Sequence, residues 1–509
     1  MSVSECTSSS AKCKEGLQQP WVHALSSAAV FIGSIVGQFS FGYAGDSIGR
    51  EEGMIMTLSI ATFGAAGSAC FSFGDSIYVY IVISVFRFIL GVGIGGIYPL
   101  SAVKAAEDAA LPNHDQFPHA RDTCYEEGLP NPVLSSQKSH SSPSQPPHSP
   151  PSIASTTLHI EPSHMHSGPL VHNGPLTINV NTSVEVAKSF FWQIPGTMMP
   201  WLIGYLLTLN KSLPDTVKWK LLLGLGAVPT SIALLLSCVE LYLKAPLHPH
   251  DSISLLAHSE MRLQQRKETI MAVENALKSS EYQWKLVGTG GSWFVYDIIL
   301  YGLLLYGSRV ISALAGMNHD NISFEARIAY ISSRQLIALS VGVPSVMCTI
   351  VLLKHLHTKA AQVVSFLLIS FAFFLFAGLY DFLLRTNSDA AFALYCVLYF
   401  TVIGGPNVTT YVLPSETYPV SVRSTFNGIS AALGKLGAAT GAAIVSMDYV
   451  LRHVVCRMDA KFCLLFHPTL FYVIVFAYCQ LIVECGGVCF VRCLCSDWCH
   501  YICNVSGLQ

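Results

Sequence analysis

The stretch Ser292–Leu305 reads SWFVYDIILYGLLL, and it decides how the rest of the chain is interpreted. It is apolar enough to begin a membrane-spanning helix, yet it carries one carboxylate, Asp297. Trp293, Asp297 and Tyr301 recur every four residues, so a helix places all three on one face. A carboxylate at the centre of a spanning helix costs about 2.5–3.5 kcal/mol and is tolerated mainly where it faces a partner or a watery cavity. This face is therefore predicted to line a solute pathway; the alternative is an acid that reaches water near the helix end.

The composition is that of a protein that crosses the membrane several times. Of the 509 residues, 51% are hydrophobic and only 12% are charged, whereas a soluble domain carries about 25% charged residues. Long apolar runs at this low charge predict a polytopic membrane protein. The net charge of -2 offers no basic surface for nucleic acid. The 16 cysteines lie mostly inside apolar runs, which is typical of small core residues rather than of a disulfide framework.

About eleven apolar stretches have the length of roughly 20 residues that spans a bilayer. Because only helices satisfy every backbone group in lipid at this length, the predicted fold class is all-α. The stretches cover approximately residues 21–44, 54–73, 77–103, 190–209, 221–243, 293–315, 335–356, 360–384, 390–413, 426–447 and 464–491.

Two long polar segments divide this series. Residues 107–185 are rich in Pro, Ser and His and are predicted to be a disordered cytoplasmic loop, whose histidines lack paired metal-ligand spacing. Residues 244–288 are predicted to be a cytoplasmic segment between two bundles, with a charged, helix-prone part that reads SEMRLQQRKETIMAVENALKSS. The remaining divisions are a polar N-terminus (1–20), the first three and last two spans of an N-terminal bundle (21–106 and 186–243), a C-terminal bundle (289–491) and a Cys-rich cytoplasmic tail (492–509).

The distribution of Lys and Arg predicts the orientation. If the turn holding Asp46 and Arg50 is cytoplasmic, both long polar segments and the C-terminus are cytoplasmic as well. Cys456 and Cys463 then share an outer loop and are candidates for a disulfide. The cysteines of the tail lie just past a span, which favours S-palmitoylation over a metal site.

Between the first two apolar stretches the chain reads GYAGDSIGR, residues 42–50. Its three glycines allow a tight turn, and Asp46 and Arg50 can pair at the membrane surface. This segment resembles the signature loop after the second helix of the major facilitator superfamily. The third stretch contains RFILGVGIGGIYPLSA, in which Arg87 begins the span and Gly91 and Gly95 form a small-xxx-small face for close helix contact.

A second signature is the segment 404–441, GGPNVTTYVLPSETYPVSVRSTFNGISAALGKLGAATG. Asn407 and Lys435 are polar groups within apolar helices, and its later glycines repeat the small-xxx-small spacing. The element PSETYPVSVR, with Glu416 and Arg423, resembles the turn after the tenth helix in sugar-porter-like members.

Together these segments resemble the phosphate:proton symporter family of the major facilitator superfamily, of the eukaryotic high-affinity type. In that family the fourth helix reads GVGIGGDYPLS, the seventh carries W-x3-D-x3-Y, the tenth GPN and the eleventh GK. The resemblance covers nearly all the apolar stretches and neither long polar segment. It implies a two-bundle fold with inorganic phosphate bound midway between two six-helix halves, protons as the coupled ion and a plasma-membrane location. It implies no cofactor and no metal.

The resemblance also implies the site residues. Gln193 is the loosest match, because FFWQIPGT keeps only the glutamine. Asp297 is implied to carry the coupled proton. The implied substrate-binding residues are Tyr98, Gln193, Trp293, Asp297, Tyr301, Asn407 and Lys435, and the implied conformational residues are Asp46, Arg50, Arg87, Glu416 and Arg423.

Physical chemistry is consistent with this assignment. Phosphate needs donors in a dry site, and tyrosine hydroxyl, indole N–H, amide and ammonium groups supply them. A carboxylate beside an anion repels it unless protonated, so Asp297 is expected to hold a proton while phosphate is bound. The alternative for Lys435 is a structural pair with a carboxylate, and that for Asn407 is an interhelical hydrogen bond.

The sequence departs from the family pattern at three places. Only the polar residues 1–20 precede the first apolar stretch, so the family's first helix is expected to be missing. Either the recorded chain lacks its start, which the intact later motifs favour, or the protein is a divergent eleven-helix form. The family's aspartate before the tyrosine of the fourth helix is Ile97, which removes a second coupling acid. The family's Pro-Glu-Ser element is replaced by LKAPLHPHD, residues 243–251.

The predicted function is a secondary active transporter that imports inorganic phosphate with protons by alternating access. One alternative is a transporter of another small solute, an organic anion or a sugar, and another is a non-transporting phosphate sensor or scaffold. An enzyme is least favoured, because the sequence carries neither a nucleotide-binding glycine loop with a Lys-Ser/Thr end nor a cluster of metal ligands in its spans.

Overall fold

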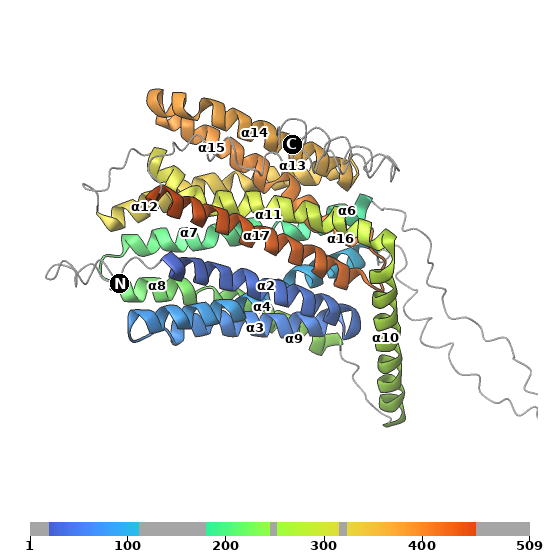
Figure 1. Ribbon diagram of the computed structural model, residues 1–509. Coiled ribbons are helices and arrows are strands. Elements are labelled where there is room, and N and C mark those ends of the chain that lie inside the picture. The colour runs from blue at the N-terminus through green and yellow to red at the C-terminus, as the bar shows by residue number, and fades with distance from the viewer. Residues whose placement is uncertain (1–19, 111–179, 245–251, 315–322, 455–509) are drawn as a thin grey trace, which may run out of the picture. The chain divides into compact units, whose positions relative to one another are not determined.

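The computed structural model describes residues 20–110, 180–244, 252–314 and 323–454, and within these ranges every element is a helix (Figure 1). Most of the predicted loop 107–185, the last predicted span 464–491, the Cys456–Cys463 pair, the Cys-rich tail and nearly all of the polar N-terminus lie outside the described residues.

The first half of the fold is built around α4. In chain order its helices are α2 (Pro20–Ser47), α3 (Arg50–Cys70), α4 (Ser76–Ala110), α6 (Val180–Phe190), α7 (Gln193–Leu209), α8 (Asp215–Gly224) and α9 (Ala227–Lys244). α2 and α3 both pack along α4, and α8 and α9 cover α3. Gly91 and Gly95 lie directly against the backbone of α2, at Val30 and Ser34, where a Cβ would clash. The predicted small-residue face of this helix is therefore confirmed as a close helix contact.

The second half is built around α11 and α17. A long helix, α10 (Ser252–Lys278), leads into this half, whose helices are α11 (Ser280–Leu314), α12 (Phe324–Ser340), α13 (Gly342–Leu353), α14 (Thr358–Thr386), α15 (Ser388–Ile403), α16 (Gly405–Thr417) and α17 (Arg423–Val454). α11 and α17 pack along each other, with Gly437 against the backbone of Phe294 and Gly441 against that of Ile298. Only Ser279 separates α10 from α11, and the helix-prone part of the segment between the bundles is helical.

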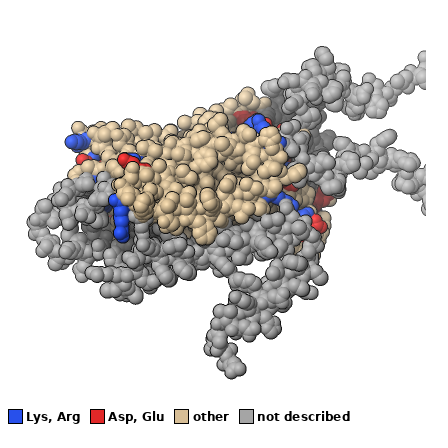
Figure 2. Space-filling view, turned by 90° about the horizontal axis from the view of Figure 1, so that it is seen from above, with Lys and Arg blue, Asp and Glu red and all other residues tan. Residues whose placement is uncertain are grey.

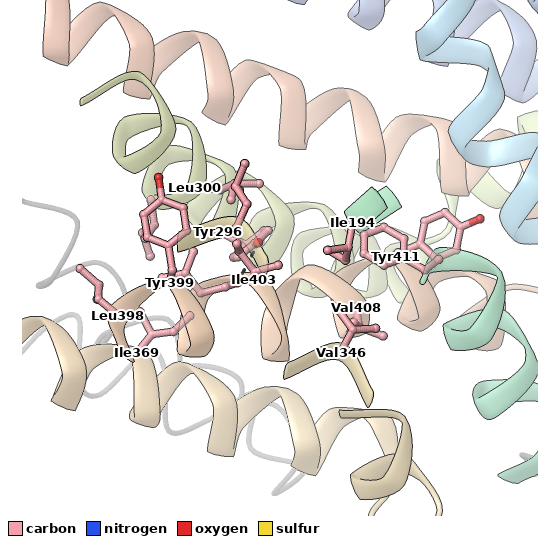
Figure 3. Packing of buried hydrophobic residues seen from close by; sticks show 14 of the residues in the cluster. Ile194, Tyr296, Leu300, Val346, Ile369, Leu398, Tyr399, Ile403, Val408 and Tyr411 are labelled. Carbon is pink, nitrogen blue, oxygen red and sulfur yellow. Dashed lines mark hydrogen bonds between the residues drawn. The ribbon is translucent and has the colours of Figure 1, made fainter. Parts of the chain in front are cut away.

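The main buried apolar cluster lies between α11, α15 and α16 and extends to α13, α14 and α7 (Figure 3). Tyr296 of α11 donates from its hydroxyl to the carbonyl oxygen of Val402 at 3.0 Å, which ties α11 to α15. Ile194 of α7 belongs to the same cluster, so the two halves share apolar packing. The residues labelled in Figure 3 are Ile194, Tyr296, Leu300, Val346, Ile369, Leu398, Tyr399, Ile403, Val408 and Tyr411.

The halves meet mainly along α2 with α17 and α7 with α12, and also where α4 packs on α16 and α17 and α6 packs on α13 and α16. Gly42 of α2 and Gly428 of α17 lie against each other, so closely that a Cβ on either residue would clash with the backbone of the other helix. Close backbone approach of this kind is how membrane helices associate, because lipid supplies no hydrophobic driving force between them.

The surface of the described helices is that of a membrane protein. Seven stretches are long and apolar enough to cross a membrane, namely Ala28–Ser47, Arg50–Cys70, Ile77–Ala110, Asp215–Leu243, Glu325–Leu353, Thr358–Tyr380 and Ser388–Thr417. Figure 2 shows a broad uncharged band on the viewed face, with charged residues gathered toward its two ends. Large apolar side chains such as Leu235 and Phe371 are about two-thirds exposed, at 65% and 66%, which suits contact with lipid. The chain is thus an all-α, multi-pass membrane protein.

Candidate functional site

Lys435 on α17 and Asp297 on α11 form an ion pair inside the fold. The Lys435 Nζ lies 3.0 Å from the Asp297 Oδ2, and the two residues are 5% and 2% exposed. Lys435 also donates to the Tyr301 hydroxyl at 2.9 Å, and the Trp293 side chain hydrogen-bonds to the Asp297 carboxylate. Pairing offsets the large cost that either charge would incur alone in this environment.

Aromatic rings enclose the Lys435 ammonium group. Its Nζ lies 4.7 Å from the centre of the Tyr301 ring and 5.3 Å from that of Tyr98, within the range of a cation–π attraction. Tyr98 meets Trp293 edge-on, with ring centroids 6.4 Å apart. Trp293 in turn packs on Gly434, where a Cβ would clash with the indole. Because Tyr98 belongs to α4, this cation is held between the two halves.

Gln193, the first residue of α7, extends the group in the first half of the fold. Its Nε2 donates to the Tyr98 hydroxyl at 3.0 Å. Its Oε1 is buried and has no hydrogen-bond partner among the described residues. Six of the seven predicted substrate residues therefore form one connected group.

Asn407 does not join that group through any contact recorded among the described residues. It is buried near the start of α16, and its Nδ2 donates to the carbonyl oxygen of Ile403, one turn earlier, at 3.1 Å. This bond joins the end of α15 to the start of α16 within one apolar stretch. A substrate contact by Asn407 stays a prediction.

A second polar group joins the halves where α2 ends and α17 begins. Asp46 Oδ1 accepts from the backbone N–H of Ser424 at 3.2 Å, and Oδ2 accepts from the backbone N–H and hydroxyl of Thr425, each at 2.7 Å. The carboxylate of one half thus caps the first turn of a helix in the other, where free N–H groups and the helix dipole favour an anion. The predicted pair with Arg50 is present at 3.2 Å.

Arg50 connects this group to further elements. It donates to the Glu107 carboxylate at 2.9 Å and to the carbonyl oxygen of Val420, in the turn before α17, at 3.2 Å. Arg423 donates to the carbonyl oxygen of Tyr418 at 3.0 Å. Burial raises the pKa of Tyr418 to about 12. The predicted conformational residues Arg50 and Arg423 thus both bind the turn between α16 and α17.

Glu416 lies at the end of α16, also beside the first half. Its carboxylate accepts from the Thr358 hydroxyl at 2.9 Å and hydrogen-bonds to the side chain of Ser183 on α6. α6 and α16 pack together, so Glu416 is a further contact between the halves.

Arg87 lies well inside α4, as the predicted stretch 77–103 places it. It is eleven residues after Ser76, where the helix begins. The apolar residues between these two positions continue the helix, so its start is set by the turn before Ser76. The guanidinium makes no hydrogen bond or ion pair within the described residues.

Lys218, which belongs to none of the sequence motifs, connects the halves at the other end. Lys218 of α8 donates to the Glu325 carboxylate, in the first turn of α12, at 2.8 Å, and lies 3.4 Å from Asp215. In Figure 1 this pair belongs to the helix ends opposite the Asp46 junction. The described structure is therefore joined by polar contacts at both ends.

Comparisons with known proteins agree with this architecture. The profile of the family described as "Sugar (and other) transporter" matches residues 3–116. The chain is 29% identical over 421 residues to "Inorganic phosphate transporter PT2" of Toxoplasma gondii, which covers 83% of this chain and 58% of that protein. It is 28% identical over 432 residues to "Low affinity inorganic phosphate transporter 4" of Lotus japonicus, covering 83% of this chain and 73% of that protein. These relatives are named transporters rather than enzymes.

Solved structures show the same fold. The proton:xylose symporter XylE bound to 6-bromo-6-deoxy-D-glucose superposes with a TM-score of 0.58 at 14% identity, covering 92% of this chain and 86% of that one. A partially occluded, inward-open form of the E. coli xylose transporter XylE gives a TM-score of 0.55 at 13% identity, covering 93% and 90%. The chain is thus a multi-pass membrane protein with the major facilitator fold, and its sequence is related to proteins named inorganic phosphate transporters.

Proposed function

We propose that this protein is a secondary active transporter that moves inorganic phosphate across a membrane by alternating access of its two halves. The observation that carries the proposal is the Lys435 ammonium, held by Asp297 of its own half and faced by Tyr98 of the other half. A buried cation between two bundles suits a small anion. The relatives named inorganic phosphate transporters support phosphate as that anion.

The surrounding side chains supply the donors that phosphate requires. The Lys435 ammonium gives a charge-assisted hydrogen bond, and the hydroxyls of Tyr98 and Tyr301 add neutral donors. Gln193 donates through its amide when it turns from Tyr98. Asn407 becomes a donor if its Nδ2 leaves the Ile403 carbonyl. An anion bound here contacts both halves, so it favours their closure around it.

The ion pair also suggests how a proton is coupled to phosphate. Phosphate competes with Asp297 for the Lys435 ammonium, and a carboxylate displaced beside an anion is favoured in its protonated form. Asp297 then carries a proton while phosphate is bound. After phosphate and the proton are released, its carboxylate pairs with Lys435 again. Because Ile97 stands where the resemblance implies a second acid, we assign the coupling to Asp297 alone.

Alternation requires the contacts at the two ends to break in turn. The Asp46, Arg50 and Glu416 contacts hold the halves together at one end, where Arg423 supports the turn that Arg50 binds, and Lys218 with Glu325 holds the other end. We infer that the Asp46 end faces the cytoplasm, that Arg87 takes part in the same rearrangement and that the protein imports phosphate at the plasma membrane.

A transporter of another solute is the second candidate. The pairing of a single cation with one carboxylate favours a small anion over a sugar, which would need more amide groups on the helices of the second half. A phosphate sensor that binds without transporting has the same site, and only flux separates it from a transporter.

The decisive experiment is uptake of labelled phosphate by cells that lack their own phosphate uptake and express this chain. We expect uptake that rises at acidic external pH and falls when a protonophore removes the proton gradient. Uptake that ignores both pH and protonophore removes the proton from the proposal. Protein that reaches the membrane and binds phosphate without any flux favours the sensor.

A further inference from the structure

Gln38 on α2 has a buried side-chain amide to which none of the contacts above assigns a function. The residue is 0% exposed, and neither Nε2 nor Oε1 has a hydrogen-bond partner among the described residues. A buried amide that has lost its hydrogen bonds to water and made none to the protein destabilises the fold, so such a group needs an explanation. One explanation is a ligand that pairs with it during part of the transport cycle.

Gln38 lies on the face of α2 that turns toward α17. Phe31, seven residues earlier and therefore on the same face, packs edge-on against Tyr301 with ring centroids 5.0 Å apart. Gly42, four residues later, lies against the first turns of α17, and the Gln38 carbonyl oxygen itself approaches Gly428. The stripe of α2 that carries Phe31, Gln38 and Gly42 thus begins beside Tyr301, a residue of the candidate site, and follows the interface between the halves.

The packing of α2 against α4 shows at which level along the bundle axis Gln38 lies. α2 and α4 run in the same direction, and Ser34 lies against Gly95. Gln38 follows Ser34 by one turn, and Tyr98 follows Gly95 by about one turn. Gln38 is therefore level with the part of α4 that carries Tyr98, a residue of the candidate site.

The directions of the side chains bring Gln38 and Lys435 toward each other. A helical side chain tilts toward the N-terminus of its own helix, and α2 and α17 run in opposite directions. Lys435 therefore tilts toward Gly428, which is the residue of α17 that lies against Gln38. Gln38 tilts toward Phe31 and hence toward Tyr301. The two side chains converge on the same level of the interface from opposite directions.

We propose that the Gln38 carboxamide is a further phosphate-positioning group, which donates from Nε2 to a phosphate oxygen and accepts at Oε1 from a phosphate hydroxyl. This inference rests on the proposed function of the Lys435 site. Monobasic phosphate carries bare oxygens and hydroxyl groups, so both amide atoms gain partners at once. Sulfate carries only bare oxygens and leaves Oε1 unpaired, so Gln38 favours phosphate over sulfate.

The test is binding of inorganic phosphate to the purified full-length protein, measured by the rise in melting temperature with phosphate concentration. Gln38→Leu keeps a similar volume and removes the unpaired amide, so its melting temperature without phosphate is expected to equal or exceed that of the wild type. Its apparent Kd for phosphate is expected to rise about tenfold, because two hydrogen bonds to the anion are lost. Its preference for phosphate over sulfate is expected to fall.

Gln362 on α14 offers a matched control. It is also 0% exposed and also lacks partners for both amide atoms within the described residues, but none of the candidate site residues lies on α14. Gln362→Leu is expected to keep the wild-type Kd and sulfate preference. Gln38→Glu is a second variant that keeps the shape of the side chain and places a carboxylate beside the anion. It is expected to weaken phosphate binding more than Gln38→Leu, and it carries the test if the leucine variant does not fold.

The outcomes separate the two proposals. Wild-type Kd and sulfate preference in the Gln38 variants overturn the role of Gln38 and leave the proposed function standing. Equal weakening in Gln362→Leu also overturns it, because the effect then comes from general repacking. A wild-type protein whose melting temperature ignores phosphate overturns the proposed function, and the role of Gln38 with it.

Discussion

The carboxylate of Asp46 accepts the backbone N–H of Thr425 at 2.7 Å, although the two residues are 379 positions apart in the chain. Asp46 lies in the last turn of α2, in one half, and Thr425 lies in the first turn of α17, in the other. If the halves alternate as proposed, this contact exists only while this end of the molecule is closed. A charged cap is stronger than a neutral one because the helix dipole adds to the hydrogen bonds.

We expect Asp46→Asn to open this end. The substitution keeps the shape but removes the charge that Arg50 and the α17 N-terminus both bind, and a hydrogen bond to a charged group is worth about 1.5–3 kcal/mol. The equilibrium should then shift toward the open form by about tenfold or more. Spin labels at Ile48 and Val420, which are 42% and 49% exposed, would report the change as a longer distance population. Asp389→Asn, at a side chain that is 85% exposed, is the control and should leave the distances unchanged.

Asp297→Asn is expected to uncouple phosphate from protons. Asparagine resembles the protonated acid, so Lys435 remains available for phosphate while no proton can be carried. Accumulation against a gradient should be lost, whereas exchange of labelled for unlabelled phosphate should persist and become independent of pH. Both are measured in proteoliposomes at acidic and neutral pH. Accumulation that stays proton-driven in this variant would remove Asp297 from the coupling mechanism.

Lys435→Ala is expected to damage both stability and binding. It leaves the Asp297 carboxylate buried and unpaired, which costs about 3–5 kcal/mol of unfolding free energy. Adding Asp297→Leu removes the unpaired charge and should restore most of the melting temperature. Phosphate binding should stay lost in the double variant, because the cation is absent. Recovery of binding together with stability would show that Lys435 serves only to neutralise Asp297.

Part of the site could be predicted because it depends on local spacing. Trp293, Asp297 and Tyr301 share a helix face by their four-residue repeat, and the structure keeps all three together. Asp46 and Arg50 are likewise four residues apart and form the expected pair. The partner of Asp297 was harder to predict, because Lys435 lies 138 positions away in the chain. From the sequence, Lys435 could be either a structural partner of a carboxylate or a phosphate ligand.

Other parts could not be predicted, because they depend on contacts between distant segments. A Ser-Thr sequence at a helix start suggests a cap, but nothing local shows that the backbone N–H of Thr425 is capped by an acid of the other half. Gln38 is notable only because it is buried without partners, and neither property is visible in a sequence. Lys218 resembles any surface lysine until its distance to Glu325 is known.

The Lys218–Glu325 pair yields a prediction for the other end of the molecule. The two side chains are 13% and 43% exposed, so water and salt weaken the pair, and such pairs contribute about 0–1 kcal/mol. Lys218→Glu should favour opening at this end through repulsion of Glu325. The combined Lys218→Glu and Glu325→Lys exchange should restore the wild-type rate of uptake at low ionic strength. Uptake rates that are the same in all three proteins would exclude a role for this pair in closure.

Gly437→Ala tests whether close contact between α11 and α17 positions the site. A Cβ at Gly437 would clash with the backbone oxygen of Phe294, and backbone cannot move as a flexible side chain does. Overpacking of this kind costs about 1–3 kcal/mol, and it separates the helices that carry Asp297 and Lys435. Phosphate affinity should therefore fall together with the melting temperature.

Gly378→Ala on α14 is the control for Gly437→Ala, because it is expected to raise stability rather than lower it. A Cβ there meets nothing within 4 Å, so Gly378→Ala should raise stability by about 0.5–1 kcal/mol through the better helix propensity of alanine. Its phosphate affinity should not change. If Gly437→Ala also gained stability and kept its affinity, the α11–α17 spacing would be loose enough to accept a methyl group, and the Lys435–Asp297 distance would not depend on it.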